Sequence, residues 1–384
     1  MSRESAEKSS PRPSDGPLFV VGVPRSGTSL LYALLNQHPQ IALLYEGDLP
    51  ALWPLFLTRR SKSQWLERWN FWNGSIERHQ IDTSRIPSNV SDIRTATETA
   101  YRQYTQKKNA SIWGCKSPNQ YDSLVRLAVL FPNARFVIIR RDPADVCRSI
   151  IRASKNSAHF THKGLAHRAL LGCYRLGIER DRLLQRGVRV HVLQYQDLIR
   201  TPVDELMKIC RFLGIPFHSS MASLQNADRS AVMDGAHNTL VKGESIVASR
   251  NQPEVLPVKF RRKIERYKSF WRQKHVDWEI FPPSEEPNLT KPPLLERAYD
   301  QLLYRLLRSW DVFVIFVYCF CPVRWLTAYR AWKGDPYLMQ LAFASDGAGD
   351  VQEVATAPAQ SPARTMQHQV EKQSRHENTR RESW

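Results

Sequence analysis

Cysteine is scarce in this chain, and its spacing gives no metal site. Six cysteines occur among 384 residues, mostly inside apolar stretches, and none shows C-x-x-C spacing. Zinc sites and small disulfide-bonded scaffolds both need cysteines that are denser or more regularly spaced. The sequence therefore argues against both and favours a reducing compartment, which we expect to be the cytoplasm. Acidic clusters with metal-ligand spacing are also lacking, so we expect no bound metal.

Long apolar runs are lacking too. The run Val312–Val323 has twelve residues, whereas a membrane-spanning helix needs about 20. Segment 1–17 is polar, and we expect a flexible arm there without a signal peptide or anchor. Arginine, lysine and tryptophan residues follow the apolar run over 324–333, as in helices that lie on membrane surfaces. A docked helix or strand and peripheral contact with the inner membrane surface therefore both stay open.

Acidic residues are few relative to basic ones. The chain has 55 lysines and arginines against 37 aspartates and glutamates, a net charge of +18 and a pI near 9.8. Such a balance suits a nucleotide, an acidic acceptor, a nucleic acid or an anionic membrane, and charge alone does not choose among them. An apolar content of 42% with eleven tryptophans is typical of a globular protein.

The most informative stretch lies near the N-terminus. The apolar run Leu18–Val21 predicts a buried strand, Gly22–Gly27 breaks it, and leucines at helical spacing follow. A strand, a glycine loop and a helix together form an anion cradle, because backbone N–H groups and the helix dipole converge there. Arg25 supplies a fixed charge, and the hydroxyls of Thr28 and Ser29 can bond a phosphate oxygen. An ordinary strand-to-helix turn is the alternative.

The loop also lacks the lysine of nucleoside triphosphate enzymes. It is nearly G-x-x-x-x-G-K-[ST], but Thr28 stands in the lysine position and the cation has moved to Arg25. This argues against a kinase. The pattern P-[RK]-S-G-T-[ST]-L resembles the 5′-phosphosulfate loop of sulfotransferases that use 3′-phosphoadenosine-5′-phosphosulfate (PAPS), above all the branch with tyrosylprotein and bacterial enzymes. The resemblance implies donor-binding roles for Arg25, Ser26, Gly27, Thr28 and Ser29.

Further along, strands and helices alternate, which predicts an α/β fold: a P-loop-like central parallel sheet flanked by helices, with a helical C-terminal extension. The predicted strands are 18–21, 41–44, 111–115, 134–139 and 188–193, and the predicted helices are 28–35, 49–58, 96–106, 120–130, 143–153, 165–186, 203–213, 259–272 and 294–310. Ligands of such sheets bind outside the carboxyl ends of the strands. The predicted organisation is an arm (1–17), the α/β domain (18–280), a helical and apolar extension (281–343) and a disordered tail (344–384).

Within the α/β domain, residues 59–94 are aromatic and polar with weak periodicity. We interpret them as an insertion that shapes an acceptor pocket. The alternative is that its tryptophans only pack a loop against the core.

A second cationic group follows the strand at 134–139. Arg140 and Arg141 precede Asp-Pro, and Ser149 lies eight residues after Arg141, two turns along the predicted helix. A guanidinium and a hydroxyl so placed can hold one anion together, although a solvated charge cluster is the alternative. The stretch resembles the 3′-phosphate element R-[ND]-P-x-D-x-x-x-S of PAPS sulfotransferases. That resemblance implies 3′-phosphate ligation by Arg141 and Ser149, with Arg140 as a second cation.

The resemblance also implies the catalytic residues. Lys116, in Lys-Ser-Pro, resembles the lysine of Asn-Lys-Asp-Pro that holds the leaving phosphosulfate oxygen, a role it would share with Arg25. Glu46 stands where that branch carries the glutamate that takes the acceptor proton. Because the segment reads Tyr-Glu-Gly-Asp, Asp48 is an alternative base. An ordinary surface lysine and a helix-start carboxylate are the alternatives for Lys116 and Glu46.

Two weaker matches complete the resemblance, which spans about 18–250. Tyr195 resembles the tyrosine of a Tyr-Glu-Asp-Leu segment and would lie against the adenine, with a buried core tyrosine as the alternative. Lys242 and Gly243 resemble the Lys-Gly of a late cofactor loop that meets the 3′-phosphate.

These features together predict an enzyme that moves a sulfuryl group from PAPS to a hydroxyl acceptor by in-line transfer. The acceptor is a carbohydrate, a lipid or small metabolite, or a tyrosine. The product is 3′-phosphoadenosine 5′-phosphate (PAP), and no nucleic acid is expected as partner. Two other functions stay open: a P-loop nucleotide kinase, which needs magnesium and the missing lysine, and a non-enzymatic polyanion binder.

Overall fold

The computed structural model describes residues 16–57, 60–156, 165–228, 230, 232, 246, 255–274 and 292–332. Residues 1–326 form one compact unit and 327–384 another, and both the sheet and the candidate site lie in the first. Residues 1–15 of the predicted arm and the predicted tail lie outside the described residues.

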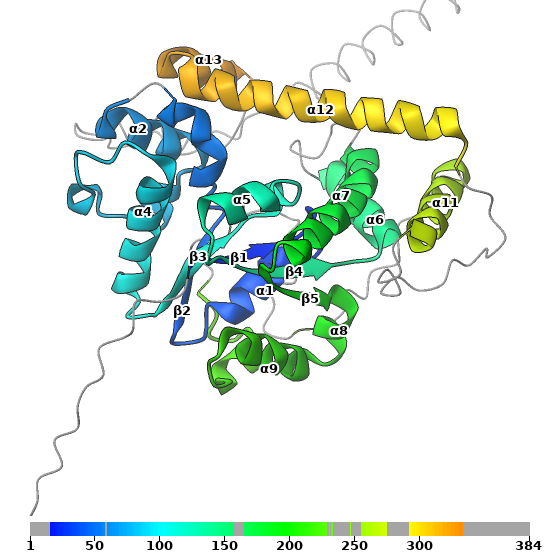
Figure 1. Ribbon diagram of the computed structural model, residues 1–384, viewed down its shortest axis with the longest axis horizontal. Helices are drawn as coiled ribbons and strands as arrows, with labels where there is room; N and C mark the ends of the chain where they lie inside the picture. Colours follow the sequence, from blue (N-terminus) through cyan, green and yellow to red (C-terminus); the bar gives the residue numbers. More distant parts are fainter. Residues whose placement is uncertain are drawn as a thin grey trace, which may run out of the picture. The chain divides into compact units, whose positions relative to one another are not determined.

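Five parallel strands form the central sheet, in the order β2-β3-β1-β4-β5 (Figure 1). Their bounds are Leu18–Val21 (β1), Ile41–Tyr45 (β2), Ile112–Lys116 (β3), Arg135–Arg140 (β4) and Arg189–Gln194 (β5). The predicted fold class is confirmed, and each predicted strand is present within one residue of its expected bounds. Short continuous apolar stretches predict the inner strands well because these strands are buried on both faces.

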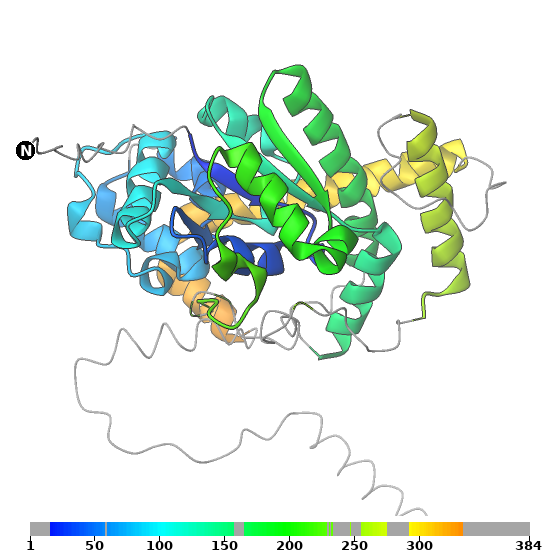
Figure 2. The same cartoon turned by 90° about the horizontal axis from the view of Figure 1, so that it is seen from below.

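Alternation along the strands divides the core into two layers. Phe19 and Phe136 belong to the cluster on one face, and Val20 and Val137 to the cluster on the other. Figures 1 and 2 show the first face covered by α5, α6 and α7 and the second by α1, α8 and α9. These helices are Thr28–Leu35 (α1), Leu124–Leu130 (α5), Pro143–Asn156 (α6), Leu165–Gln185 (α7), Tyr195–Arg200 (α8) and Pro202–Leu213 (α9). Helix α8 was not predicted from the sequence.

The connections that leave β1 and β4 run toward opposite edges of the sheet. From β1 the chain passes through α1 to β2 at one edge of the sheet, whereas from β4 it passes through α6 and α7 to β5 at the other edge. The loops that leave these two neighbouring strands therefore diverge on opposite faces. Ligands of open α/β sheets bind at such a point, so the fold directs attention to the carboxyl ends of β1 and β4.

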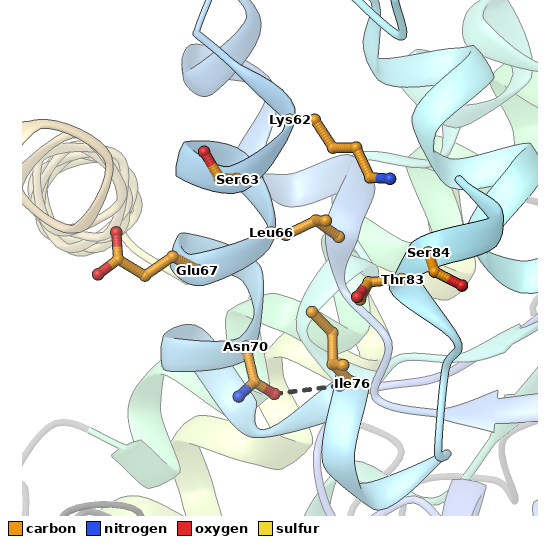
Figure 3. Close-up of a pocket in the computed structure, with 8 residues that line it drawn as sticks. All are labelled: Lys62, Ser63, Leu66, Glu67, Asn70, Ile76, Thr83 and Ser84. Carbon is orange, nitrogen blue, oxygen red and sulfur yellow. Dashed lines mark hydrogen bonds between the residues drawn. The ribbon is translucent and has the colours of Figure 1, made fainter. Parts of the chain in front are cut away.

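Residues 59–94 are more helical than their weak periodicity predicts. They contain α2 (Lys62–Asn73), α3 (Ser75–Arg78) and a 3-10 turn, η2 (Thr83–Arg85), and α2 begins with a capping box formed by Ser61 and Gln64. Trp65 and Trp69 are fully buried, so they do pack this segment against the core. A hollow of about 470 Å³ lies between α2, α3 and η2 (Figure 3). None of its lining residues is a predicted site residue.

Three local expectations need correction or extension. The predicted helix at 49–58 is a 3-10 helix, η1 (Leu49–Phe56), which contains Pro50 and Pro54. The predicted helix at 96–106 is longer, α4 (Ile93–Lys107), and a 3-10 turn, η3 (Pro118–Gln120), precedes α5. The predicted helix at 294–310 and the apolar run after it form one helix, α12 (Leu294–Phe320). No glycine or proline interrupts that span, and α13 (Val323–Trp332) begins after Pro322.

An ion cluster fastens α12 to the domain. Asp300 is fully buried and accepts from Lys263 (2.7 Å) and Tyr267 (2.5 Å) of α11 (Val258–Lys274), and it lies 2.9 Å from Nε2 of His167 on α7. A buried carboxylate is stable only when it is paired in this way. No helix within the described ranges is both long and apolar enough to cross a membrane.

Candidate active site

The β1–α1 loop needs an unusual backbone. Arg25 (φ 74°) and Gly27 (φ 103°) both lie in the left-handed region, which glycine adopts at little cost and arginine does not. A Cβ at Gly27 would collide with the Tyr195 ring, so this position also requires the absence of a side chain. The loop thereby brings Ser26, whose hydroxyl is buried and has no hydrogen-bond partner among the described residues, next to the strand ends.

Residues distant in sequence meet around Arg25. Its Nε donates to Oγ of Ser149 (3.1 Å), and Arg141 donates to the Arg25 carbonyl oxygen (3.1 Å). The Arg141 guanidinium also lies over the Tyr195 ring, 4.2 Å from its centroid. From the sequence, Arg25 is expected at the 5′-phosphosulfate, Arg141 and Ser149 at the 3′-phosphate, and Tyr195 against the adenine. The structure brings all four into one cluster at the divergence of β1 and β4.

Positive charge is concentrated in this cluster. Burial, and after it the neighbouring Arg141, lower the pKa of Arg25 to about 10, and Arg152 on α6 acts in the same direction. Arg152 lies one helical turn beyond Ser149. That spacing could have identified it as a further cation of the cluster, which the sequence analysis missed.

A second group of side chains lies at the ends of β2 and β3. The Lys116 ammonium contacts Oε1 of Glu46 at 2.7 Å and lies 3.9 Å from the centroid of the Tyr45 ring. Tyr45 also shares a hydrogen bond with Ser29 (3.0 Å). Burial alone would lower the pKa of Lys116, but Glu46 and Tyr45 outweigh it, so the net pKa is raised. Lys116 is therefore a charged lysine inside the protein, and the surface-lysine alternative is wrong.

Asp48, the alternative base, has a different environment. It is fully buried, and it accepts hydrogen bonds from Ser117, Asn119 and Gln120. Burial and the nearby Glu46 raise the pKa of its carboxyl group. Because its oxygens are already engaged inside the protein, Asp48 stabilises the turn, whereas the Glu46 side chain keeps 19% exposure.

The segment 59–94 holds the turn that carries Glu46. Asn73 donates to the Glu46 carbonyl oxygen, and Trp69 donates to that of Gly47 (2.5 Å). Arg78 donates to the Tyr45 carbonyl oxygen (3.4 Å), and its charge interacts favourably with Glu46 and Asp48. These partners matter because Glu46 and Asp48 both have positive φ, 51° and 49°. No motif marks Asn73 or Arg78 in the sequence, so the sequence analysis could not find them.

His79 predicts a pH dependence of stability. It is buried and accepts from the Tyr45 N–H (3.2 Å), and burial lowers its pKa from 6.5 to about 3. The unfolded chain therefore binds a proton below pH 6.5 that the native protein excludes. This contribution to stability is complete above pH 6.5 and declines as pH falls, by up to about 1.4 kcal/mol per pH unit. Urea unfolding at pH 7 and pH 5 should show this decline.

His79→Gln is the variant for this comparison, since it keeps a polar side chain but does not titrate. It should reduce the pH dependence without abolishing it, because burial also lowers the pKa of His38 and His191. An unchanged slope in His79→Gln would contradict the assignment.

Among the described residues with a predicted role at the site, Arg140 does not join the two groups. Arg140 has its charged neighbours Arg180 and Asp181 on α7, on the opposite side of β4 from Ile139. Strand alternation therefore separates it from Arg141, and it cannot supply the second cation expected from its position in sequence. Lys242 and Gly243 lie outside the described residues.

Comparison with known proteins gives one family. A family model described as "Sulfotransferase family" matches residues 17–219. Similar curated proteins are Protein-tyrosine sulfotransferase 1 of Danio rerio, 26% identical over 53% of this chain and 54% of that protein, and Protein-tyrosine sulfotransferase 2 of Gallus gallus, 26% identical over 53% and 52%. The chain thus spans about half the length of the curated relatives it matches. Among solved structures, the "Sulfotransferase Domain from the Curacin Biosynthetic Pathway" aligns with a TM-score of 0.48 and 19% identity over 71% of this chain and 100% of that one.

Proposed function

Because this chain belongs to the sulfotransferase family, we propose that it transfers a sulfuryl group from PAPS to a hydroxyl group of an acceptor and releases PAP. The observation that carries the proposal is the buried Lys116–Glu46 pair. It lies at the same edge of the sheet as the cationic cluster of Arg25 and Arg141, since both groups follow the carboxyl ends of parallel strands.

The residues present fit an anionic donor. Two neighbouring arginines and a buried hydroxyl without a partner in the described structure favour a ligand with several phosphate oxygens. Arg25, Ser26 and the loop backbone would hold the phosphosulfate, as the resemblance implies, and Arg141 with Ser149 would hold the 3′-phosphate. The Arg25–Ser149 hydrogen bond links the two sets of contacts. A donor with both groups is therefore held by one connected set of side chains.

Transfer requires a stabilised leaving oxygen and a group that accepts one proton. The acceptor oxygen forms a bond to sulfur, the bond from sulfur to the phosphate oxygen breaks, and the acceptor proton passes to Glu46. Lys116 contacts Oε1 of Glu46, which leaves Oε2 to accept that proton. Lys116 keeps further N–H donors for the leaving oxygen, and its charge is fixed before the reaction starts.

The acceptor is a hydroxyl compound: a carbohydrate, a lipid or small metabolite, or a tyrosine. The names of the similar proteins from Danio rerio and Gallus gallus support including tyrosine. A cytoplasmic location stays a prediction from the cysteine content.

The test is incubation with labelled PAPS and a panel of such acceptors, with Glu46→Gln beside Asp48→Asn. Glu46→Gln should lower kcat by about a hundredfold or more, since general base catalysis contributes about 10²–10⁴-fold. Asp48→Asn should mainly lower the melting temperature, because the Asp48 oxygens accept hydrogen bonds from buried partners. Absence of label transfer by the wild type to every acceptor, or full activity of Glu46→Gln, would contradict the proposal.

A further inference from the structure

Helix α12 exposes a continuous apolar face. Six large side chains recur along it at intervals of three or four residues, which is the spacing of one helix face. Their exposed fractions range from 55% to 83%, for Leu295, Tyr299, Leu302, Leu306, Trp310 and Phe313. We call these six side chains the outer face of α12. Exposed leucines are common singly, but an apolar row of this length on a soluble surface marks an interaction site.

All acidic residues of α12 lie away from this face. Glu296 pairs with Arg266 (3.1 Å), and the buried Asp300 pairs with Lys263 (2.7 Å). The third, Asp311, pairs with Arg168 of α7. The charged side chain left among the outer-face residues is Arg305, which is exposed and makes no ion pair within the described part of the chain. The outer face is therefore apolar, and the charge of the exposed Arg305 beside it is positive.

An arginine-lined hollow opens beside the outer face. It measures about 560 Å³ and lies between α7, α12 and the turn that precedes α5. Its charged lining residues are Arg175, Arg182, Arg305, Arg308, Asp122 and Glu179. Both carboxylates are already engaged. Asp122 binds Arg308 and the Tyr304 hydroxyl, each at 2.6 Å. Glu179 accepts from Arg182 (3.1 Å) and from the Val125 N–H (3.0 Å).

The hollow consequently keeps an excess of positive charge. Arg175 donates to the neutral amide of Gln301 (3.0 Å), and Arg305 has no carboxylate partner in the described residues. A phosphate group is one of the anions that guanidinium groups bind well, because its oxygens match their N–H donors.

We propose that the outer face of α12 and the adjoining hollow form a docking surface for a bilayer that contains anionic phospholipids. The six apolar side chains enter the interfacial region, and the hollow receives a phosphate headgroup. Tyr299 and Trp310 suit this position because each has an apolar ring and a polar tip. Exposed Arg324 and Trp325 continue the pattern beyond Pro322. This inference goes beyond the proposed function and does not depend on it.

Charge favours a bilayer over a second copy of the chain. An identical copy would present the same arginines, and like charges opposed across an interface are repulsive. An anionic membrane supplies the opposite charge, and helices with cationic and aromatic residues on one apolar face bind there.

Co-sedimentation of the full-length protein with phosphatidylcholine vesicles, with and without phosphatidylglycerol, tests the proposal. Wild type should bind the phosphatidylglycerol vesicles and release them as sodium chloride rises. The variant Leu306→Gln/Trp310→Ser should bind more weakly, by about tenfold for each large side chain removed. Arg305→Glu should also weaken binding to the anionic vesicles. Inorganic phosphate added as competitor should leave the part of the binding that the apolar side chains provide unchanged.

Matched controls separate this face from general charge and hydrophobicity. Met207→Ser alters an exposed apolar residue on α9, and Arg262→Glu alters an exposed arginine of α11 outside the hollow. Neither should change binding, and all variants should melt as wild type does. The proposal is overturned if Leu306→Gln/Trp310→Ser binds vesicles normally. It is equally overturned if sedimentation velocity shows a lipid-independent dimer that this variant dissociates while wild type ignores vesicles.

Discussion

Replacing Lys116 with alanine is expected to lower kcat for sulfuryl transfer by about a hundred- to a thousandfold, the usual loss when a preorganised donor to the leaving oxygen is removed. Lys116 is 1% exposed and is held by Glu46 and Tyr45, so water cannot readily take its place. The measurement is initial-rate transfer from labelled PAPS, with PAP affinity determined separately. PAP affinity should change much less than kcat, because the ammonium acts mainly on charge that develops during transfer.

Lys108→Ala is the matched control. Lys108 also pairs with a carboxylate, Asp228 at 2.9 Å, but 43% of its side chain is exposed. Its loss should leave kcat unchanged. The double variant Glu46→Gln/Lys116→Ala should lose less than the product of the two single losses, since the two residues form one contact. Retention of full kcat by Lys116→Ala would show that the buried pair is structural only.

Replacing Arg141 with alanine is expected to weaken PAP binding by about ten- to a hundredfold, the value of a charge-assisted hydrogen bond. Binding of AMP, which has no 3′-phosphate, should change little. Isothermal titration with both nucleotides measures the two effects. Arg141→Lys should recover little, because a lysine cannot both cover the Tyr195 ring and donate to the Arg25 carbonyl oxygen as the guanidinium does.

Arg148→Ala provides the comparison for Arg141. Arg148 lies on α6, which begins two residues after Arg141. It pairs with Asp145 at 2.8 Å, and its loss should leave affinity for both nucleotides unchanged. Should Arg141→Ala lose PAP and AMP equally, Arg141 would act by holding the β1–α1 loop in place, and its assignment to the 3′-phosphate would be wrong.

The position of Glu46 depends on residues that perform no chemistry. Its turn has two residues with positive φ, and side chains from α2 and α3 hold the carbonyl groups on either side of it. The segment 59–94 thus has a demonstrable role in positioning Glu46, whereas its role in binding an acceptor stays a prediction.

Local sequence was sufficient to predict the family and the order of the strands along the chain. The family match confirms the resemblance that Gly22–Ser29 carries, whereas the donor-binding roles of these residues stay a prediction. The resemblance was recognisable because the loop is contiguous: its glycines, cation and hydroxyls lie within eight residues. The strands were predictable because burial on both faces requires unbroken apolar runs. A single residue such as Tyr195 could have either a binding role or a role in the core, and the sequence left both alternatives open.

Tertiary structure alone decided which charged groups meet. Arg25 and Ser149 are 124 positions apart, and Lys116 and Glu46 are 70 apart. Their contacts depend on parallel register, which sets Tyr45 beside Lys116 and Val20 beside Lys116. Arg140 and Arg141 are neighbours in sequence, but Arg140 lies against α7 and Arg141 contacts the β1–α1 loop. Strand register and side-chain direction decide this difference. The sequence by itself determined which chemical groups are available, and the sheet decided their partners, because strand pairing and alternation are set by packing across the whole core.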